Sequence, residues 1–263
     1  MPDGENTAGA GPILRLRGVG RRFGGLDAVR DIDLDVAPGE RRAILGPNGA
    51  GKTTLFNVIS GDMPASAGTI EFRGEDVSAI SAAGRAKRGI GRTYQNSRLF
   101  LGLSVEDNLY LAVLGTRNGH LRPFLRKEDK EHRARARELA ATVGLNNRGG
   151  TPVGALSHGE QRELGVAMAR AGDPKLMLLD EPASGLSRGE RVALTELLLA
   201  LDTSITLILI EHDMDVALRV ANSVTMMHDG RKIVEGTPDE IRANDLVHEL
   251  YLGGRVAGAE GQP

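Results

Sequence analysis

The segment that decides the fold of this chain is Gly46-Pro47-Asn48-Gly49-Ala50-Gly51-Lys52-Thr53, which follows the pattern G-x-x-x-x-G-K-[ST]. A short apolar strand is expected before it, at residues 42–45, and a helix after it, at residues 52–60. The glycines let several backbone N–H groups point at one phosphate, at a helix start that carries partial positive charge. A chance glycine-rich turn is the alternative, and it leaves both flanks unexplained. The segment therefore predicts a site for a nucleoside triphosphate.

The side chains of this loop have separate expected roles. Lys52 would reach the β- and γ-phosphates, and Thr53 would offer its hydroxyl to Mg²⁺. Because phosphoryl transfer depends on positioning and charge neutralisation, we also count Lys52 among the catalytic residues. The residues expected to touch the nucleotide here are Gly46, Pro47, Asn48, Gly49, Ala50, Gly51, Lys52, Thr53 and Thr54.

A second apolar run ends in two carboxylates, at Leu176-Met177-Leu178-Leu179-Asp180-Glu181. Asp180 would hold the Mg²⁺ indirectly, from beyond its direct ligands, and so complete the metal site begun by Thr53. Glu181 would polarise the attacking water as a general base. Solvated charges at a strand end are the alternative for this motif taken alone. Together with the phosphate loop, the pair predicts hydrolysis of the nucleotide.

Strand and helix patterns alternate along most of the chain. Apolar and polar residues alternate at 13–17 and 28–36, which is typical of half-exposed antiparallel strands. The other elements that we expect are strands at 69–72, 89–94, 175–180 and 206–210, and helices at 105–114, 130–143, 157–170 and 189–201. Near the end, Asp229-Gly230 between two strand patterns is a strong hairpin signal. The sequence therefore predicts an α/β fold with a parallel sheet, an inserted helical region and an antiparallel flank.

The composition is that of a soluble globular protein and excludes several kinds of function. The 263 residues carry Lys+Arg 33 against Asp+Glu 35, a formal net charge of −2, which argues against nucleic acid as a partner. There is no Cys, so disulfides and thiolate metal sites are excluded. No apolar stretch approaches the roughly 18–20 residues of a membrane-spanning helix, and the first residues lack the pattern of a signal peptide. We therefore expect a cytoplasmic protein with disordered tails at 1–11 and 254–263.

A helix start precedes the acidic strand, at Leu156-Ser157-His158-Gly159-Glu160. Ser157 and Glu160 have the S-x-x-E spacing of a capping box, a structural interpretation that does not exclude function. The segment resembles the LSGGQ signature of the ABC ATPases, which also stands between the phosphate loop and the acidic strand. The resemblance extends over about residues 13–253 and implies a P-loop NTPase core that uses ATP and Mg²⁺. It implies an ATP-binding domain at 12–253, with a helical subdomain at about 97–172.

Smaller motifs of the same family are also present. Gln95 resembles the Q-loop glutamine that touches Mg²⁺, and His212 resembles the switch histidine that contacts the γ-phosphate. Phe23 stands where the family places an aromatic ring on adenine, and residues 183–187 resemble the D-loop that links two active sites. Taken alone, Gln95 would be plain surface and His212 an ordinary strand-end histidine, so the set as a whole carries the resemblance.

Two residues depart from the family pattern. His158 replaces the first glycine of the usual signature, and Ser187 replaces the usual aspartate of the D-loop. His158 either adds a donor near the phosphate or faces outward, and Ser187 weakens any signalling between sites that uses a carboxylate. Neither belongs to the phosphate loop or the acidic pair, so hydrolysis is still expected.

The resemblance also implies partners, because in this family the signature of one subunit completes the ATP site of another. Ser157, Gly159 and Glu160 would contact ATP held by a second ATP-binding subunit, in a homodimer or a heterodimer. The region at about 95–114 would pass the motion to separate transmembrane permease subunits. The chain would then lie on the inner face of the cell membrane, and an external substrate-binding protein would act on it only indirectly.

Closer likenesses point to one cargo. The segments that resemble branched-chain amino-acid importers are 23–26, 92–95, 98–100, 105–109, 236–238 and 251–253, with a polar insertion at about 115–131. Lipopolysaccharide export, whose ATPase shares the ending, and urea or short-chain amide import are the alternatives within the family.

Two functions of another class compete with transport. A soluble ABC ATPase acting on ribosomes or DNA would carry a second nucleotide unit, long coiled-coil insertions or a basic surface, and the sequence shows none of these. An ATP-dependent switch with little turnover would not need Glu181 or His212. Both competing classes are therefore less consistent with the sequence than a transport ATPase.

Overall fold

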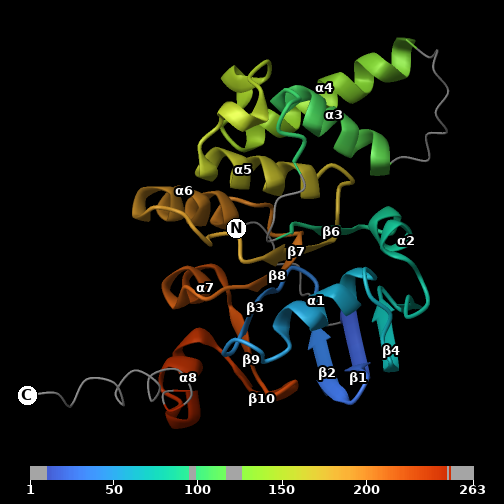
Figure 1. Ribbon diagram of the computed structural model, residues 1–263, viewed down its shortest axis with the longest axis vertical. Helices are drawn as coiled ribbons and strands as arrows, with labels where there is room; N and C mark the ends of the chain where they lie inside the picture. Colours follow the sequence, from blue (N-terminus) through green and yellow to red (C-terminus); the bar gives the residue numbers. More distant parts are fainter. Residues whose placement is uncertain (1–10, 95–98, 117–125, 248, 250–263) are drawn as a thin grey trace, which may run out of the picture.

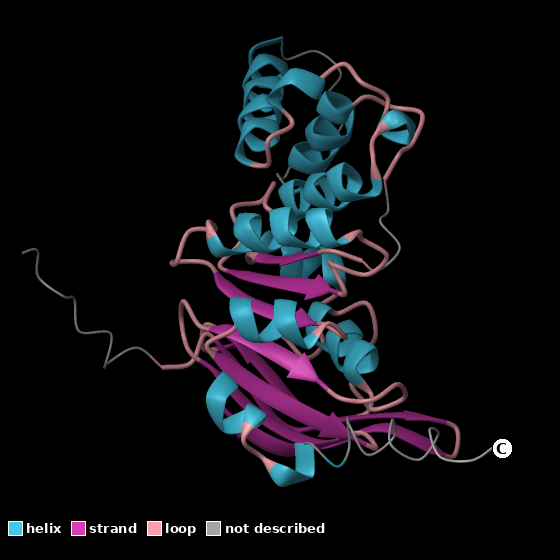
Figure 2. Cartoon of the chain, turned by 90° about the vertical axis from the view of Figure 1, so that its left-hand side faces the viewer, coloured by secondary structure: helices cyan, strands magenta, loops and turns pink. Residues whose placement is uncertain are grey.

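The computed structural model describes residues 11–94, 99–116, 126–247 and 249. Helices gather at one end of the molecule and antiparallel strands at the other, with a parallel sheet between them (Figures 1 and 2). The predicted class, α/β with a parallel sheet, an antiparallel flank and an inserted helical region, is confirmed.

The strands form two sheets. Their bounds are β1 Leu14–Phe23, β2 Leu26–Val36, β3 Arg41–Leu45, β4 Ala67–Phe72, β5 Glu75–Asp76, β6 Ile90–Arg92, β7 Leu176–Asp180, β8 Thr206–Ile210, β9 Ser223–His228 and β10 Arg231–Gly236. The first sheet has the order β2-β1-β4-β5, and the second has the order β10-β9-β3-β8-β7-β6.

The second sheet is parallel apart from its last hairpin. β3 pairs in parallel with β8 and β9, and β7 pairs in parallel with β8 and β6, whereas β10 returns antiparallel to β9. Every residue of β7 and β8 is buried, as expected for continuous apolar runs in a sheet that is covered on both faces. The expected hairpin turn at Asp229-Gly230 lies between β9 and β10.

Eight α-helices lie in the described part of the chain. They are α1 Lys52–Ser60, α2 Ala82–Lys87, α3 Val105–Thr116, α4 Arg126–Thr142, α5 His158–Ala169, α6 Arg188–Leu199, α7 Met214–Val220 and α8 Pro238–Arg242. One face of the parallel sheet packs with α1 and the antiparallel sheet around Phe56 and Ile59. The opposite face is covered by α6 and α7 through Leu194, Leu198 and Val216.

The helical region has its own hydrophobic core. Val105 and Leu109 of α3 are buried in one cluster with Leu139 of α4 and Leu164 of α5. This cluster supports the expectation of a helical subdomain, whose boundaries at 97 and 172 stay predictions, as does the extent of the whole domain at 12–253.

The predicted start of α4 was wrong. The helix begins at Arg126, about four residues before the start expected from the sequence, because its first turn is polar and carries no apolar periodicity. The polar insertion expected at about 115–131 overlaps the end of α3 at Thr116 and the start of α4 at Arg126, and its extent stays a prediction. The intervening residues 117–125, like both expected tails except residue 11, lie outside the described residues.

Among the described helices, none combines the length and the apolar character that crossing a bilayer requires.

Candidate functional site

The phosphate loop joins the end of β3 to the start of α1, and two of its glycines are required by geometry. Gly46 has a φ of 151°, and a Cβ there would lie 2.1 Å from the carbonyl oxygen of Met227. Gly51 has a φ of 94°, and a Cβ there would lie 2.3 Å from the carbonyl oxygen of Ala28. Both positions therefore accept only glycine.

The turn of the β9–β10 hairpin is hydrogen-bonded to the phosphate loop. The N–H of Gly230 donates to the carbonyl of Ala50 (3.1 Å), and the N–H of Arg30 donates to the carbonyl of Gly230 (2.7 Å). The hairpin thereby ties the phosphate loop to β2. The sequence predicted both the loop and the hairpin, but not this contact between them.

Lys52 lies against its own loop. Its Nζ donates to the carbonyl oxygens of Gly46 (2.6 Å) and Pro47 (3.0 Å), and the residue is only 5% exposed. Burial lowers the pKa of Lys52, and the nearby carboxylates of Glu181 and Asp180 partly oppose that shift. The loop, β7 and the residue that follows β7 therefore converge on one site. The other loop positions range from buried Ala50 to exposed Asn48, Gly49 and Thr53, with Pro47 and Thr54 half-buried.

Asp180 ends β7 with one oxygen bonded and one without a donor. Its Oδ2 accepts from Nη2 of Arg92 (3.0 Å), and its backbone N–H donates to the hydroxyl of Thr93 (3.2 Å). Its Oδ1 is buried, and no donor in the described ranges reaches it. Burial raises the pKa of this carboxyl, against the influence of Arg92.

The residues at this point suit a divalent cation. A buried carboxylate oxygen without a donor, together with the exposed Thr53 hydroxyl at the start of α1, forms the hard oxygen environment that Mg²⁺ prefers. Gln95, expected to join them, lies outside the described residues.

Glu181 and His212 meet where β7 and β8 end. Nε2 of His212 lies 2.6 Å from Oε1 of Glu181. Glu181 has a φ of 47° and donates its backbone N–H to the carbonyl of Ile210, so its strained backbone is anchored to the neighbouring strand. The His212 side chain is 44% exposed and that of Glu181 9%, so the imidazole lies on the solvent side of the pair.

Glu211 also lies at this site, although no role was predicted for it from the sequence. Its Oε1 accepts from the backbone N–H of Ala183 (2.7 Å) and its Oε2 from that of His212 (3.2 Å). Burial raises the pKa of this carboxyl to about 7. An acid directly after the apolar run at 206–210 is the signal that could have identified it, since the same pattern pointed to Asp180.

The signature segment caps helix α5. Oγ of Ser157 accepts from the N–H of Glu160 (3.2 Å), and Oε2 of Glu160 accepts from the N–H of Ser157 (2.8 Å), so the expected capping box is present. Arg148 also donates to the Glu160 carboxylate. Both side chains thus have a structural role beside any contact with nucleotide.

The backbone N–H of Gly159 donates a hydrogen bond to a carboxylate of the same chain. Oε1 of Glu190, from the first turn of α6, accepts from it at 2.9 Å, while Oε2 accepts from the N–H and hydroxyl of Ser187. These donors lower the pKa of Glu190 to about 2. The start of α5 therefore holds the Glu190 carboxylate, in the way that helix N-termini favour negative charge. Ser187 is the N-cap of α6, and His158 is exposed.

Phe23 lies at the end of β1. Its ring is 41% exposed and is covered on one face by the guanidinium of Arg21, 4.7 Å from the ring centroid. An exposed ring with a flat cation beside it is suited to stacking on a planar ligand.

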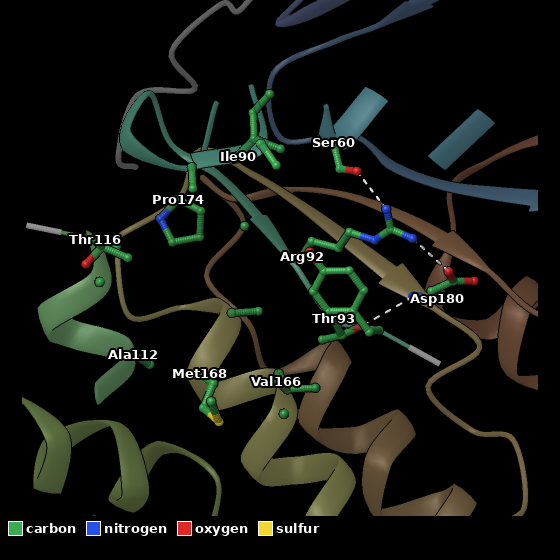
Figure 3. Close-up of a pocket in the computed structure, with 18 of the residues that line it drawn as sticks. Ser60, Ile90, Arg92, Thr93, Ala112, Thr116, Val166, Met168, Pro174 and Asp180 are labelled. Carbon is green, nitrogen blue, oxygen red and sulfur yellow. Dashed lines mark hydrogen bonds and ion pairs between the residues drawn. The ribbon is translucent and has the colours of Figure 1, made fainter. Parts of the chain in front are cut away.

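A cavity of about 340 Å³ lies between the parallel sheet and the helical region. Figure 3 shows Asp180 and Arg92 on one side of it, and Thr116, Val166 and Met168 on the other. Asp180 therefore lies at the junction with the helices, and its charge also acts on Lys52 of the phosphate loop.

Comparisons with known proteins place the chain in a family. The family model described as "ABC transporter" matches residues 29–184, more than half of the chain. A second model, "Branched-chain amino acid ATP-binding cassette transporter", matches residues 231–257.

Individual relatives cover nearly the whole chain. The high-affinity branched-chain amino acid transport ATP-binding protein LivG of Escherichia coli (strain K12) is 35% identical over 250 residues, which cover 92% of this chain and 98% of LivG. The corresponding protein BraF of Pseudomonas aeruginosa is 34% identical, with the same coverage. The solved ADP conformation of MJ1267, an ATP-binding cassette of an ABC transporter, has a TM-score of 0.80 at 26% identity and covers 92% of this chain and 98% of that chain. On these matches, the chain belongs to the ABC transporter family, among its ATP-binding subunits.

Proposed function

We propose that this chain powers the import of branched-chain amino acids through separate permease subunits. As a member of the ABC transporter family, it couples ATP hydrolysis to transport. The cargo is proposed from the whole-chain likeness to LivG and BraF and from the family match at residues 231–257. Urea and amides are the imported cargoes against which the proposal is tested, and lipopolysaccharide export is the alternative in which ATP turnover would not respond to leucine.

The observation that carries the hydrolytic mechanism is the 2.6 Å contact between His212 and Glu181, beside the phosphate loop. Lys52 would exchange its loop carbonyls for the β- and γ-phosphates of ATP, because its ammonium already lies at the loop. Glu181 would accept a proton from the attacking water, and His212 would orient Glu181 and the γ-phosphate. The remaining loop residues from Gly46 to Thr54 would hold the nucleotide through backbone N–H groups, with Phe23 stacking on adenine.

Mg²⁺ is the proposed cofactor beside ATP. The residues that would hold it are Thr53 and Gln95 directly, and Asp180 through its unpartnered Oδ1. When bound, the cation would neutralise charge on the transferred phosphoryl group.

A second ATP-binding subunit is the proposed partner at the signature. Ser157, Gly159 and Glu160 would approach the γ-phosphate held by that subunit, in a homodimer or heterodimer. The hydrogen bond from the N–H of Gly159 to the Glu190 carboxylate supports this role, since a phosphate oxygen suits the same donor and would replace that carboxylate. The assembly would lie on the inner face of the membrane with its permease subunits, and a substrate-binding protein would deliver cargo to those subunits.

Reconstitution tests the cargo. The chain and its permease subunits are reconstituted in vesicles with ATP inside and the binding protein outside, and uptake of labelled leucine is compared with that of urea and acetamide. Leucine uptake that stops in Glu181→Gln supports the proposal. If urea or acetamide is taken up instead, or if ATP turnover is insensitive to leucine and binding protein, the cargo assignment is wrong.

A further inference from the structure

Arg92, the last residue of β6, connects three elements at the metal side of the site. Its Nη1 donates to Oγ of Ser60 (2.6 Å) at the end of α1 and to Oδ2 of Asp62 (2.8 Å) just beyond it. Its Nη2 donates to Oδ2 of Asp180 (3.0 Å) at the end of β7. Figure 3 shows the guanidinium between Ser60 and Asp180. The Arg92 side chain is only 6% exposed and that of Asp180 2%, so the contact between these two residues is shielded from water, whereas the Asp62 side chain is 23% exposed.

The rest of this cluster holds the guanidinium in place. Asp62 also accepts from Oγ of Ser60 (2.8 Å) and from the hydroxyl of Tyr94 (3.2 Å), and the ring of Tyr94 lies 4.8 Å from the Arg92 guanidinium. The guanidinium is thus bound on one side by α1 and its end, and on the other by β7. Because its planar fork donates in fixed directions, it determines which oxygen of Asp180 is engaged.

We propose that Arg92 is a positioning residue for the cation: it engages Oδ2 of Asp180 and thereby leaves Oδ1 presented to the metal. This inference rests on the metal role of Asp180 in the proposed function. The two oxygens of Asp180 differ in the way that this inference requires. Oδ2 accepts a hydrogen bond from Arg92, whereas Oδ1 is buried without a donor in the described part of the chain. Groups that orient a metal-binding side chain typically change metal affinity about 10- to 100-fold when removed.

Lysine would not replace arginine here. One ammonium presents a single point of charge, whereas Arg92 uses two nitrogens to span Asp62 and Asp180. Removing the guanidinium altogether also leaves two acids without their shared cation, and the freed Asp180 carboxylate can rotate.

The test measures how much Mg²⁺ strengthens nucleotide binding. AMP-PNP is titrated calorimetrically into the full chain with Mg²⁺ and again with EDTA, for the wild type, Arg92→Gln, Arg92→Lys and Asp180→Asn. We expect Arg92→Gln to lose about 10-fold or more of the affinity gained from Mg²⁺ while its affinity in EDTA stays unchanged. Arg92→Lys should recover part of that gain. Arg88→Gln is the matched control, since Arg88 makes a comparable pair with Glu75 on the surface and should leave both affinities unchanged.

The Mn²⁺ electron paramagnetic resonance spectrum of the nucleotide complex supplies a second readout. It should change in Arg92→Gln and Arg92→Lys and remain that of the wild type in Arg88→Gln. The inference would be overturned if Mg²⁺ strengthened AMP-PNP binding to Arg92→Gln as much as to the wild type and the spectrum were unaltered. If Asp180→Asn lost that increase in affinity, the proposed function would still stand. If Asp180→Asn kept the full increase, the proposed metal role itself would be refuted. Should Arg92→Gln not fold, Arg92→Lys is compared with the wild type instead. The inference is overturned if Arg92→Lys shows the wild-type increase in AMP-PNP affinity with Mg²⁺ and the wild-type spectrum.

Discussion

Nε2 of His212 and Oε1 of Glu181 lie 2.6 Å apart, although 31 positions separate the two residues in the chain. The contact follows from the sheet, because Asp180 and Ile210 are paired and each of the two residues follows its strand by one or two positions. It joins a general-base candidate to the group best placed to orient it, within reach of the charge of Lys52.

Glu181→Gln should bind ATP and hydrolyse it poorly. The amide keeps the shape of the side chain but cannot accept the proton of the attacking water, so kcat should fall about 10²- to 10⁴-fold. Phosphate release with the permease subunits present measures this, and calorimetry checks that nucleotide affinity is retained. Glu196→Gln, which removes an exposed pair with Arg219, is the control and should turn over normally. Wild-type turnover in Glu181→Gln would exclude it as the base.

Glu211 should make the protein less stable as the pH rises from about 4.5 to 7. Its folded pKa of about 7 lies above the ordinary 4.5, so the folded state binds more protons in that window and the free energy of unfolding falls with rising pH. A shift of that size corresponds to about 3 kcal/mol.

Urea unfolding at pH 5 and pH 8 tests this expectation. Glu211→Gln should lose most of its share of the pH dependence, because the amide does not titrate, although one acceptor for the N–H groups of Ala183 and His212 is lost at both pH values. Equal pH dependence in the variant and the wild type would show that Glu211 is not the titrating group.

Ser157→Ala separates capping from nucleotide recognition. Loss of the capping hydroxyl should cost about 1 kcal/mol of stability, and Thr237→Ala should cost a similar amount because Thr237 and Glu240 form the same capping box at α8. Only Ser157→Ala should also lower kcat/KM, by about tenfold or more, since it would remove a hydrogen bond to a charged phosphate. Chemical unfolding and ATPase assays on both variants provide the comparison. Equal, unchanged ATPase in the two would reduce Ser157 to a helix cap.

Gly51→Ala should weaken nucleotide binding at least about tenfold. The new Cβ would lie 2.3 Å from the Ala28 carbonyl at a φ of 94°, so the loop has to move at a cost of about 1–3 kcal/mol. Gly189→Ala is the matched control, since a Cβ at that helical position meets nothing within 4 Å, and it should be neutral or slightly stabilising. Calorimetry with ATP distinguishes the two, and unaltered affinity in Gly51→Ala would show that the loop tolerates a side chain there.

Most elements with strong local patterns were predicted to within a residue or two, but β1 runs to Phe23, six residues beyond the end expected at residue 17. Helix α1 and strand β8 have the predicted bounds, because the phosphate-loop pattern fixes the start of one and an unbroken apolar run defines the other. Helices α2, α7 and α8 were missed, since five to seven residues are too few to show a helical period. Their N-caps Ser81, Asp213 and Thr237 were the available signals.

The sequence named candidate site residues, and their roles stay predictions, but apart from one capping box it gave none of their contacts. Glu181, His212 and Gly159 were among the candidates, yet the hydrogen bond from the N–H of Gly159 to the Glu190 carboxylate depends on how α5 packs against α6. The network of Arg92 has the same origin, because it joins residues about 30 and 88 positions away. Patterns along the chain report periodicity and local capping, whereas such contacts follow from tertiary packing.

The order of the strands has a consequence for how the site tolerates change. β8 lies between β3, which leads to Lys52, and β7, which leads to Glu181. The position of His212 along the sheet is therefore set by the length of β8. Inserting one residue in β8 would advance His212 by about 3.3 Å and turn every following side chain to the opposite face. The lengths of these strands thus fix the relative positions of the site residues that follow them. We expect relatives to differ by substitutions in these strands far more often than by insertions or deletions.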